Sequence, residues 1–86
     1  MRKLLDDASL PTDAGALAVE AAELERRLDA CRVEIQRLMD EEDPLRGIVH
    51  SAAIHQAKQS LMMLRYQRDL RVALLNRIGA NDHTPL

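Results

Sequence analysis

The chain has 86 residues, of which 47% are hydrophobic, yet it holds one Tyr and neither Phe nor Trp. This length allows one small domain, and a core without large aromatic rings is typical of thin aliphatic layers between helices. A net charge of −2 at pH 7 argues against a strongly basic surface for nucleic acid or membranes. With only three Gly and three Pro, the composition predicts an all-α protein.

The first half of the chain is predicted to form an arm and one long helix. Residues 1–12 are expected to be an N-terminal arm, and Thr12 or Asp13 can cap the helix that follows. Over residues 13–41, apolar residues recur at alternating spacings of four and three, the heptad pattern of a helix with one apolar face. This predicted hairpin seam consists of Leu17, Ala21, Leu24, Leu28, Cys31, Ile35 and Leu38.

A turn is predicted over residues 42–47. Asp43 and Pro44 form a helix-initiating pair, with Asp as the cap and Pro at the first helical position. Because Gly47 adds flexibility, the second helix can begin either at Pro44 or near Ile48. The turn therefore separates the two helices by only a few residues.

The second helix is predicted over residues 48–78, with Gly79 as its C-terminal cap and residues 80–86 as a flexible tail. Two helices of about thirty residues joined by a short turn form an antiparallel helical hairpin, here over residues 13–79. The hairpin seam of the second helix is predicted to consist of Ile54, Ala57, Leu61, Leu64, Leu75 and Ile78.

Charged residues lie beside and within the predicted seams. Glu20 is expected on the charged flank of the first helix, and Arg68 and Arg71 occupy two seam positions of the second. We expect these arginine stems to lie over apolar surface with their charges outside. Residues 1–43 hold twelve acidic and six basic side chains, and residues 44–86 hold two and six. The two halves therefore attract each other when they fold together.

The C-terminal half of the second helix carries a second apolar face, about 90° to 180° from the seam. The residues of this second apolar face are Met63, Tyr66, Leu70, Ala73 and Leu74. A hairpin gives each helix one neighbour, so this face needs another occupant. Three occupants are open: a different protein, a second copy that completes a four-helix bundle, or the arm with Leu4, Leu5 and Leu10. The face is therefore predicted to bind a partner.

The sequence offers no arrangement of residues for catalysis, for a cofactor or for a metal. His50 and His55 are five residues apart and do not share a helical face closely enough for a metal pair. Cys31 lies in the seam, where a thiol packs as a small hydrophobic group. No glycine-rich loop is present to bind phosphate. We therefore expect a protein that is not an enzyme.

Two alternative functions, an enzyme and an RNA-binding protein, are less well supported by the residues. The segment LERRLDACRVEIQRLMDE superficially resembles the first helix of the all-helical chorismate mutases, but Glu25 stands where that family has an essential Arg. Arg65, Arg68, Arg71 and Arg77 could contact phosphates, as in small helical RNA-binding dimers. They spread over more than half of the helix circumference, however, and an acidic helix lies beside them. Nucleic acid is therefore not the expected partner.

The expected compartment is a reducing cytoplasm. The single Cys31 cannot form an internal disulfide. The start, MRKLLDDASLP, has two positive charges but no apolar run behind them, so we expect no secretory signal. No stretch approaches the roughly 20 apolar residues of a membrane span.

The stretch DPLRGIVHSAAIHQAKQSLMMLRYQRDL, residues 43–70, carries a family resemblance. An acidic residue and Pro in the turn are followed by AIHQA, a tight apolar cluster and Tyr66 among basic residues. Over roughly residues 24–78 the chain resembles the small E-type proteins of bacterial type III secretion systems, which are co-chaperones of the needle subunit. It departs from them in its longer charged first helix and its N-terminal arm.

The resemblance implies a bacterial, cytoplasmic hairpin without enzymatic activity. Such a protein would bind a helical-repeat chaperone, and the pair would keep the needle subunit from polymerising before export. The resemblance places no catalytic residue on this chain. It implies that the apolar C-terminal half of the second helix is partner-binding surface, as the helical angles indicate independently.

Overall fold

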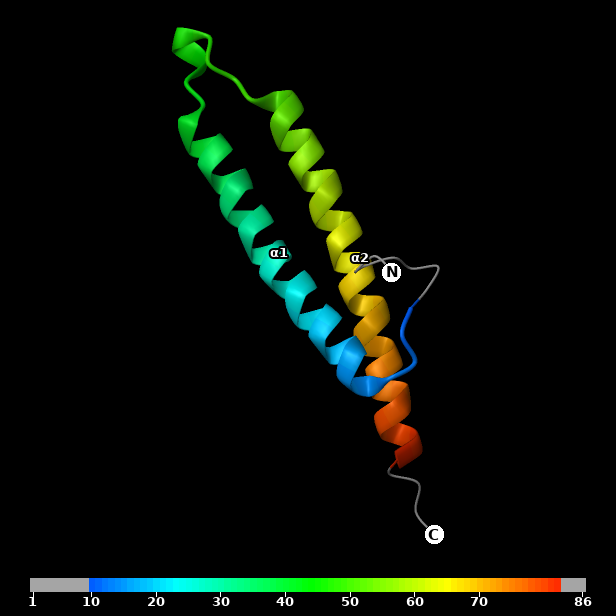
Figure 1. Cartoon of the computed structure of the whole chain (residues 1–86). Helices are drawn as coiled ribbons and strands as arrows, with labels where there is room; N and C mark the ends of the chain where they lie inside the picture. The colour runs from blue at the N-terminus through cyan, green and yellow to red at the C-terminus, as the bar shows by residue number, and fades with distance from the viewer. Residues whose placement is uncertain (1–9, 83–86) are drawn as a thin grey trace.

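The structure is a long two-helix hairpin, which confirms the predicted all-α fold. It is a computed structural model that describes residues 10–82, with the backbone alone for the last three. In chain order it holds helix α1 (Ala14–Glu41), a short 3₁₀ helix η2 (Pro44–Arg46) and helix α2 (Ser51–Asp82). Figure 1 shows α1 and α2 side by side and antiparallel, with η2 at the tip of the hairpin.

Helix α1 begins where Asp13 caps it. The backbone of Asp13 is extended, and its Oδ2 accepts a hydrogen bond from the Ala16 N–H at 2.9 Å. This bond satisfies one of the N–H groups that a helix start leaves without an intrahelical partner. Of the two predicted caps, Thr12 and Asp13, the structure uses the second. The helix ends at Glu41, because the backbone of Glu42 is extended.

The turn at the tip is a closed loop held by backbone hydrogen bonds. The Asp43 N–H donates to the Ile48 carbonyl at 2.8 Å, and the Ile48 N–H donates to the Asp43 carbonyl at 2.9 Å. Between them Pro44 opens η2, and Gly47 ends it in the left-handed conformation at φ 76°. Because the residues up to Ile48 belong to this hydrogen-bonded loop, α2 begins at Ser51, later than the predicted start at residue 48.

Helix α2 also extends further at its C-terminal end than the sequence predicted. It continues through Gly79 to Asp82, whereas the predicted helix ended at residue 78. A glycine cap adopts a positive φ, and among the described residues the glycine with a positive φ is Gly47. The predicted tail, 80–86, therefore begins as helix, and its last four residues lie outside the described part of the chain, as does most of the predicted arm.

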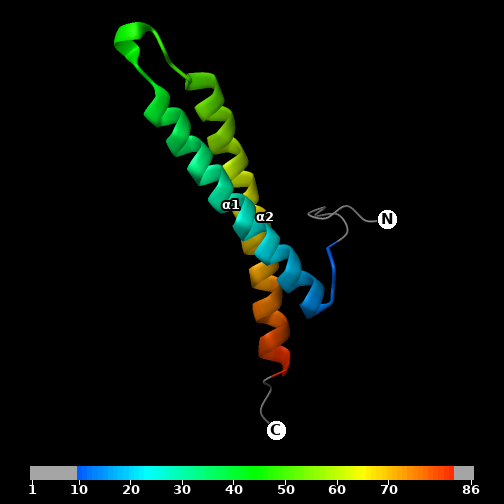
Figure 2. The ribbon, with the colours of Figure 1, turned by 60° about the vertical axis from the view of Figure 1, so that its left-hand side comes forward.

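The two helices contact each other along the predicted seams. Four leucines of α1 are fully or almost fully buried: Leu17, Leu24, Leu28 and Leu38. The other predicted seam residues are half-buried: Ala21, Cys31, Ile35, Ile54, Ala57, Leu61, Leu64, Leu75 and Ile78. Half-burial follows from the architecture, because each helix has one helical neighbour. Figure 2 shows the two helices crossing, with the end of α2 extending past the start of α1.

Two glycine substitutions are expected to change stability in opposite directions. At Gly47, alanine meets no atom within 4 Å, but the backbone at φ 76° disfavours any Cβ, so Gly47→Ala should cost about 1–2 kcal/mol. At Gly79, alanine also meets open space and lies within a helix, so Gly79→Ala should stabilise the fold by up to about 1 kcal/mol. Urea unfolding followed by circular dichroism measures both. Equal signs would contradict these backbone assignments.

Candidate functional site

The structure divides the predicted second apolar face into an exposed part and a half-buried part. Met63 and Tyr66 are 64% and 62% exposed, and Ala73 is exposed beside them. Leu70 and Leu74 are half-buried. The five residues therefore do not share one environment, and the exposed part of the predicted face is smaller than the whole.

A further large apolar residue, Met62, is exposed next to Met63 and was not included in the prediction. Its side chain is 69% exposed. Four residues advance a helix by about 40° beyond a full turn, so Met62 and Tyr66 are neighbours along one side of α2. The four-residue spacing between Met62 and Tyr66 in the sequence was enough to place Met62 on the same side of the helix. The exposed strip of α2 accordingly consists of Met62, Met63, Tyr66 and Ala73.

The half-buried part of the face lies next to the segment that leads into α1. Leu74 and Ile78 of α2 line an apolar groove together with Leu17 of α1. The remaining wall is formed by Arg77 and by residues 10–12. One of the predicted intramolecular covers, Leu10, is thus near Leu74. The other two, Leu4 and Leu5, lie outside the described residues.

Behind this face, a buried ion pair joins the helices. Arg71 Nε donates to Glu20 Oε1 at 3.0 Å, and Arg71 Nη1 donates to the Gln67 carbonyl at 2.8 Å. Arg71 is 0% and Glu20 is 1% exposed. The expectation that the Arg71 charge stays outside and that Glu20 belongs to a solvated flank was therefore wrong. Arg71 occupies a seam position, so its guanidinium lies between the helices, where Glu20 compensates its charge.

The neighbouring seam arginine, Arg68, agrees better with expectation. Its Nη1 contacts both carboxylate oxygens of Glu25 at 2.8 and 2.7 Å, and its Nε donates to Asp69 at 2.8 Å. These hydrogen bonds, the one to Asp69 foremost, raise the pKa of the Arg68 guanidinium. Arg68 therefore pairs with the acidic flank of α1 at the edge of the seam.

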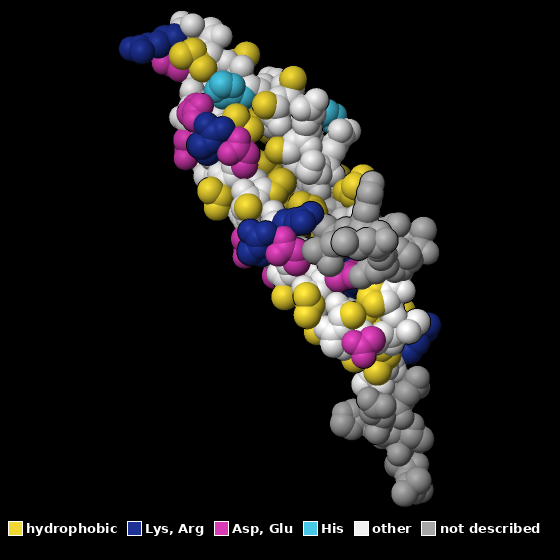
Figure 3. Space-filling model, in the orientation of Figure 1, with side chains coloured by type: hydrophobic (Ala, Val, Ile, Leu, Met, Phe, Trp, Pro, Cys, Tyr) yellow, Lys and Arg dark blue, Asp and Glu magenta, His cyan; other side chains and the backbone are white. Residues whose placement is uncertain are grey.

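Charges on the outside of α1 are balanced locally. Glu23 accepts hydrogen bonds from Arg26 and Arg27, which lower the pKa of its carboxyl group to about 2. Figure 3 shows acidic and basic side chains gathered in small mixed clusters over this face. A phosphate-binding surface needs cations free to face the ligand. Two of the four arginines considered for RNA, Arg68 and Arg71, instead contact carboxylates of α1.

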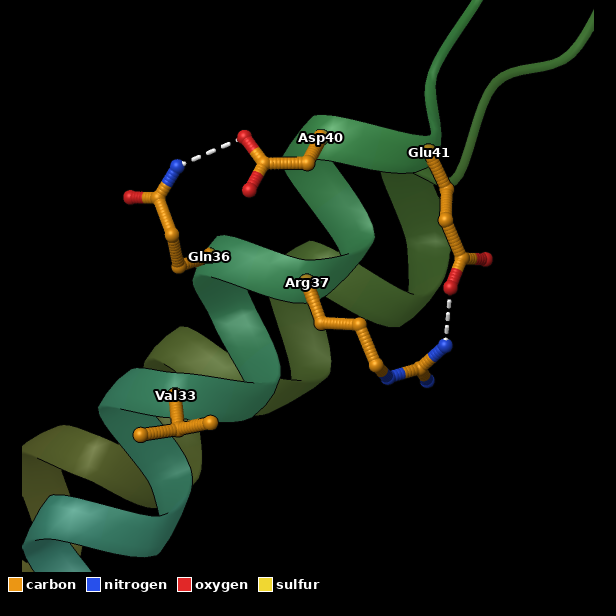
Figure 4. A pocket seen from close by; sticks show the side chains of 5 residues that line it. All are labelled: Val33, Gln36, Arg37, Asp40 and Glu41. Carbon is orange, nitrogen blue, oxygen red and sulfur yellow. Dashed lines mark hydrogen bonds and ion pairs between the residues drawn. The ribbon is translucent and has the colours of Figure 1, made fainter.

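A shallow depression lies on the outer side of α1. Figure 4 shows its lining: Val33, Gln36, Arg37, Asp40 and Glu41. All five residues belong to one helix. Gln36 donates to Asp40 at 2.8 Å, and Arg37 pairs with Glu41, so their polar groups bond to each other within the helix. The depression is open helix surface with no second wall.

The remaining side chains capable of nucleophilic chemistry or metal binding are Cys31 and the His, Asp and Glu residues. The Cys31 thiol is half-buried in the seam and donates to the Ala57 carbonyl at 3.2 Å. Among residues 10–82, no group of three His, Cys, Asp or Glu side chains is placed to hold a metal ion. In the same part of the chain, neither long helix has a stretch apolar enough to cross a bilayer.

Comparison of the chain with protein-family models, with curated proteins and with solved structures finds no match.

Proposed function

We propose that this chain is a protein-binding module without enzymatic activity, and that the exposed strip of α2 is its binding surface. The observation that carries the proposal is the exposure of Met62, Met63 and Tyr66, three large side chains that are each more than 60% accessible. They lie together on the side of α2 that α1 does not cover. Clustered exposed apolar groups of this kind mark interaction surfaces, whereas single ones are ordinary.

The shape of the strip favours a helical partner. It runs along one side of a long helix, so an amphipathic helix laid beside α2 would convert the hairpin into a three-helix contact. Methionine side chains adapt to different neighbours, and Tyr66 offers both a ring and a hydroxyl group. The α1 seam is already filled and would remain unchanged on binding.

We propose further that the module acts as a co-chaperone in type III secretion, in the bacterial cytoplasm. Support comes from the resemblance over residues 43–70 and from the hairpin layout. A subunit that polymerises through amphipathic helices must keep its apolar stripe covered until export. A hairpin that does not itself polymerise can support the helical-repeat chaperone that provides this cover.

A self-associating homodimeric four-helix bundle with a structural or regulatory role, of which RNA binding is one option, is the second candidate. The observation that favours it is the half-burial of nearly all α2 seam residues, from Ile54 to Ile78. Chains of this size commonly complete their burial by oligomerising. In this case a second copy would occupy the exposed strip.

The variant Tyr66→Asp is expected to weaken association at least tenfold while helicity stays unchanged, because a charge would be buried at the contact and solvated in the free chain. Val19→Asp is the matched control, since Val19 is 66% exposed on α1. Light scattering at two widely separated concentrations first gives the mass of the unmodified chain. Capture from the host of the chain, followed by mass spectrometry, then identifies partners.

The outcomes separate the candidates. A concentration-independent dimer that Tyr66→Asp dissociates would replace the hetero-partner by a second copy. A monomer whose partners are lost with Tyr66→Asp but kept with Val19→Asp would support the module. Recovery of partners unrelated to type III secretion would reject the co-chaperone assignment alone. Identical partners for both variants would reject the strip as the surface.

A further inference from the structure

The apolar groove at the end of the hairpin has a wall made by the chain that leads into it. Leu10, Pro11 and Thr12 line this groove together with Leu74 and Ile78. Leu10 and Pro11 are themselves half-buried, although they precede the first helix. The chain therefore reaches the half-buried part of the second apolar face before α1 begins, and residues 1–9 continue from that point.

Residues 1–9, MRKLLDDAS, match the chemistry that lies next to the groove. Leu4 and Leu5 are the two leucines of the segment, and both can extend the apolar wall that Leu10 forms. Asp6 and Asp7 precede Leu10 closely, and Arg77 forms part of the groove wall. Opposite charges on the segment and on the groove wall favour one alignment of the segment over others.

The spacing also fits. Leu70 lies one helical turn from Leu74, about 6 Å along the axis of α2. The five residues from Leu5 to Leu10 span about 7.5 Å as helix and about 16 Å fully extended. Leu5 can therefore reach Leu70 while Leu10 stays in the groove. A tethered segment of this length has an effective concentration in the millimolar range, far above that of a separate partner.

We infer that residues 1–9 dock through Leu4 and Leu5 onto Leu70 and Leu74, as an intramolecular cover of the half-buried part of the second apolar face. The cover leaves the exposed strip of α2 accessible. This inference rests on the proposed function in one respect: a partner that extends its contact from Tyr66 towards Leu74 must displace the cover. Removal of residues 1–9 then strengthens the binding of such a partner, so this segment lowers the affinity of the chain for it.

Disulfide trapping in the full-length chain tests the placement. In a Cys31→Ala background, the pair Leu5→Cys with Leu70→Cys should form an intramolecular disulfide at least tenfold faster than Leu5→Cys with Asp69→Cys. Position 69 lies at the same height on α2 but is turned by about 100°. Mild oxidation followed by intact-mass measurement gives both rates, and circular dichroism checks that each variant is folded.

A second measurement keeps the inference testable if the substituted positions disturb the contact. In the chain with Leu70→Cys and Cys31→Ala, labelling of the thiol by iodoacetamide should rise at least threefold when Leu4 and Leu5 become alanine. The control changes Arg2 and Lys3 to alanine in the same segment and should leave the rate unchanged.

Equal trapping rates for the two cysteine pairs would overturn the inference, and so would a disulfide that forms between two chains, which would assign the face to a second copy. Neither result depends on the exposed strip binding a partner. Failure of the cover and failure of the proposed function are therefore distinguishable.

Discussion

Leu28→Asp is expected to unfold the hairpin. Leu28 is fully buried between α1 and α2. Truncating such a leucine to alanine costs about 2–5 kcal/mol, and a carboxylate at the same place adds the cost of burying a charge. Small domains rarely have more than about 5 kcal/mol of stability from a single core. Circular dichroism at 222 nm should therefore show loss of most helical signal at neutral pH.

The matched control is Val33→Asp, which introduces the same residue into the same helix at a position 68% exposed. It should change the free energy of unfolding by only about 0.5 kcal/mol. Ile35→Asp should fall between the two, since Ile35 is half-buried. If Leu28→Asp and Val33→Asp behaved alike, the seam would not be where α1 and α2 meet.

The heptad spacing made the seam of α1 predictable. Each of the seven positions assigned from the four–three pattern is buried or half-buried in the structure. The pattern works because α1 packs on one side against one neighbouring helix. Loop closure was harder to predict, because the Asp43–Ile48 hydrogen bonds that delay α2 involve the backbone alone. Such bonds leave no signature in side-chain periodicity.

The candidate site was predictable in part. Helical angles separated Met63 and Tyr66 from the seam correctly, but they could not show that Leu74 lies beside residues 10–12. That contact depends on where the chain turns at Asp13. Glu20 was placed with the solvated residues because glutamate is rarely buried. Glu20 is buried because it pairs with Arg71, an arginine in a seam position. Predicting this pair requires knowledge of the register between the two helices.

Arg71→Met is expected to destabilise the hairpin by about 3–5 kcal/mol, because it leaves the Glu20 carboxylate buried without its arginine. Glu20→Leu should cost a similar amount by leaving a buried guanidinium. The double variant, Glu20→Leu with Arg71→Met, should return to wild-type stability or exceed it, since apolar replacements of a buried ion pair are often neutral or stabilising. Urea unfolding of the four proteins gives the coupling energy of the pair.

Additive losses in that cycle would mean that the two groups act independently, contrary to the 3.0 Å contact between them. The surface pair Arg32–Asp29 serves as a control, since both side chains are largely exposed and belong to one turn of α1. Exposed pairs of this kind contribute little. Removing either member there should leave the unfolding midpoint nearly unchanged.

If the Glu20–Arg71 pair contributes little net stability, its role is to select one register of α2 against α1. Shifting α2 by one heptad in either direction would place Ile78 or Leu64, in turn, where Arg71 now meets Glu20. Either shift buries the carboxylate against an apolar side chain, at a cost of several kcal/mol. The apolar double variant loses this penalty, so its amide NMR spectrum should show more than one set of α2 resonances where the wild type shows one. A single set in both proteins would assign the register to the Asp43–Ile48 loop instead.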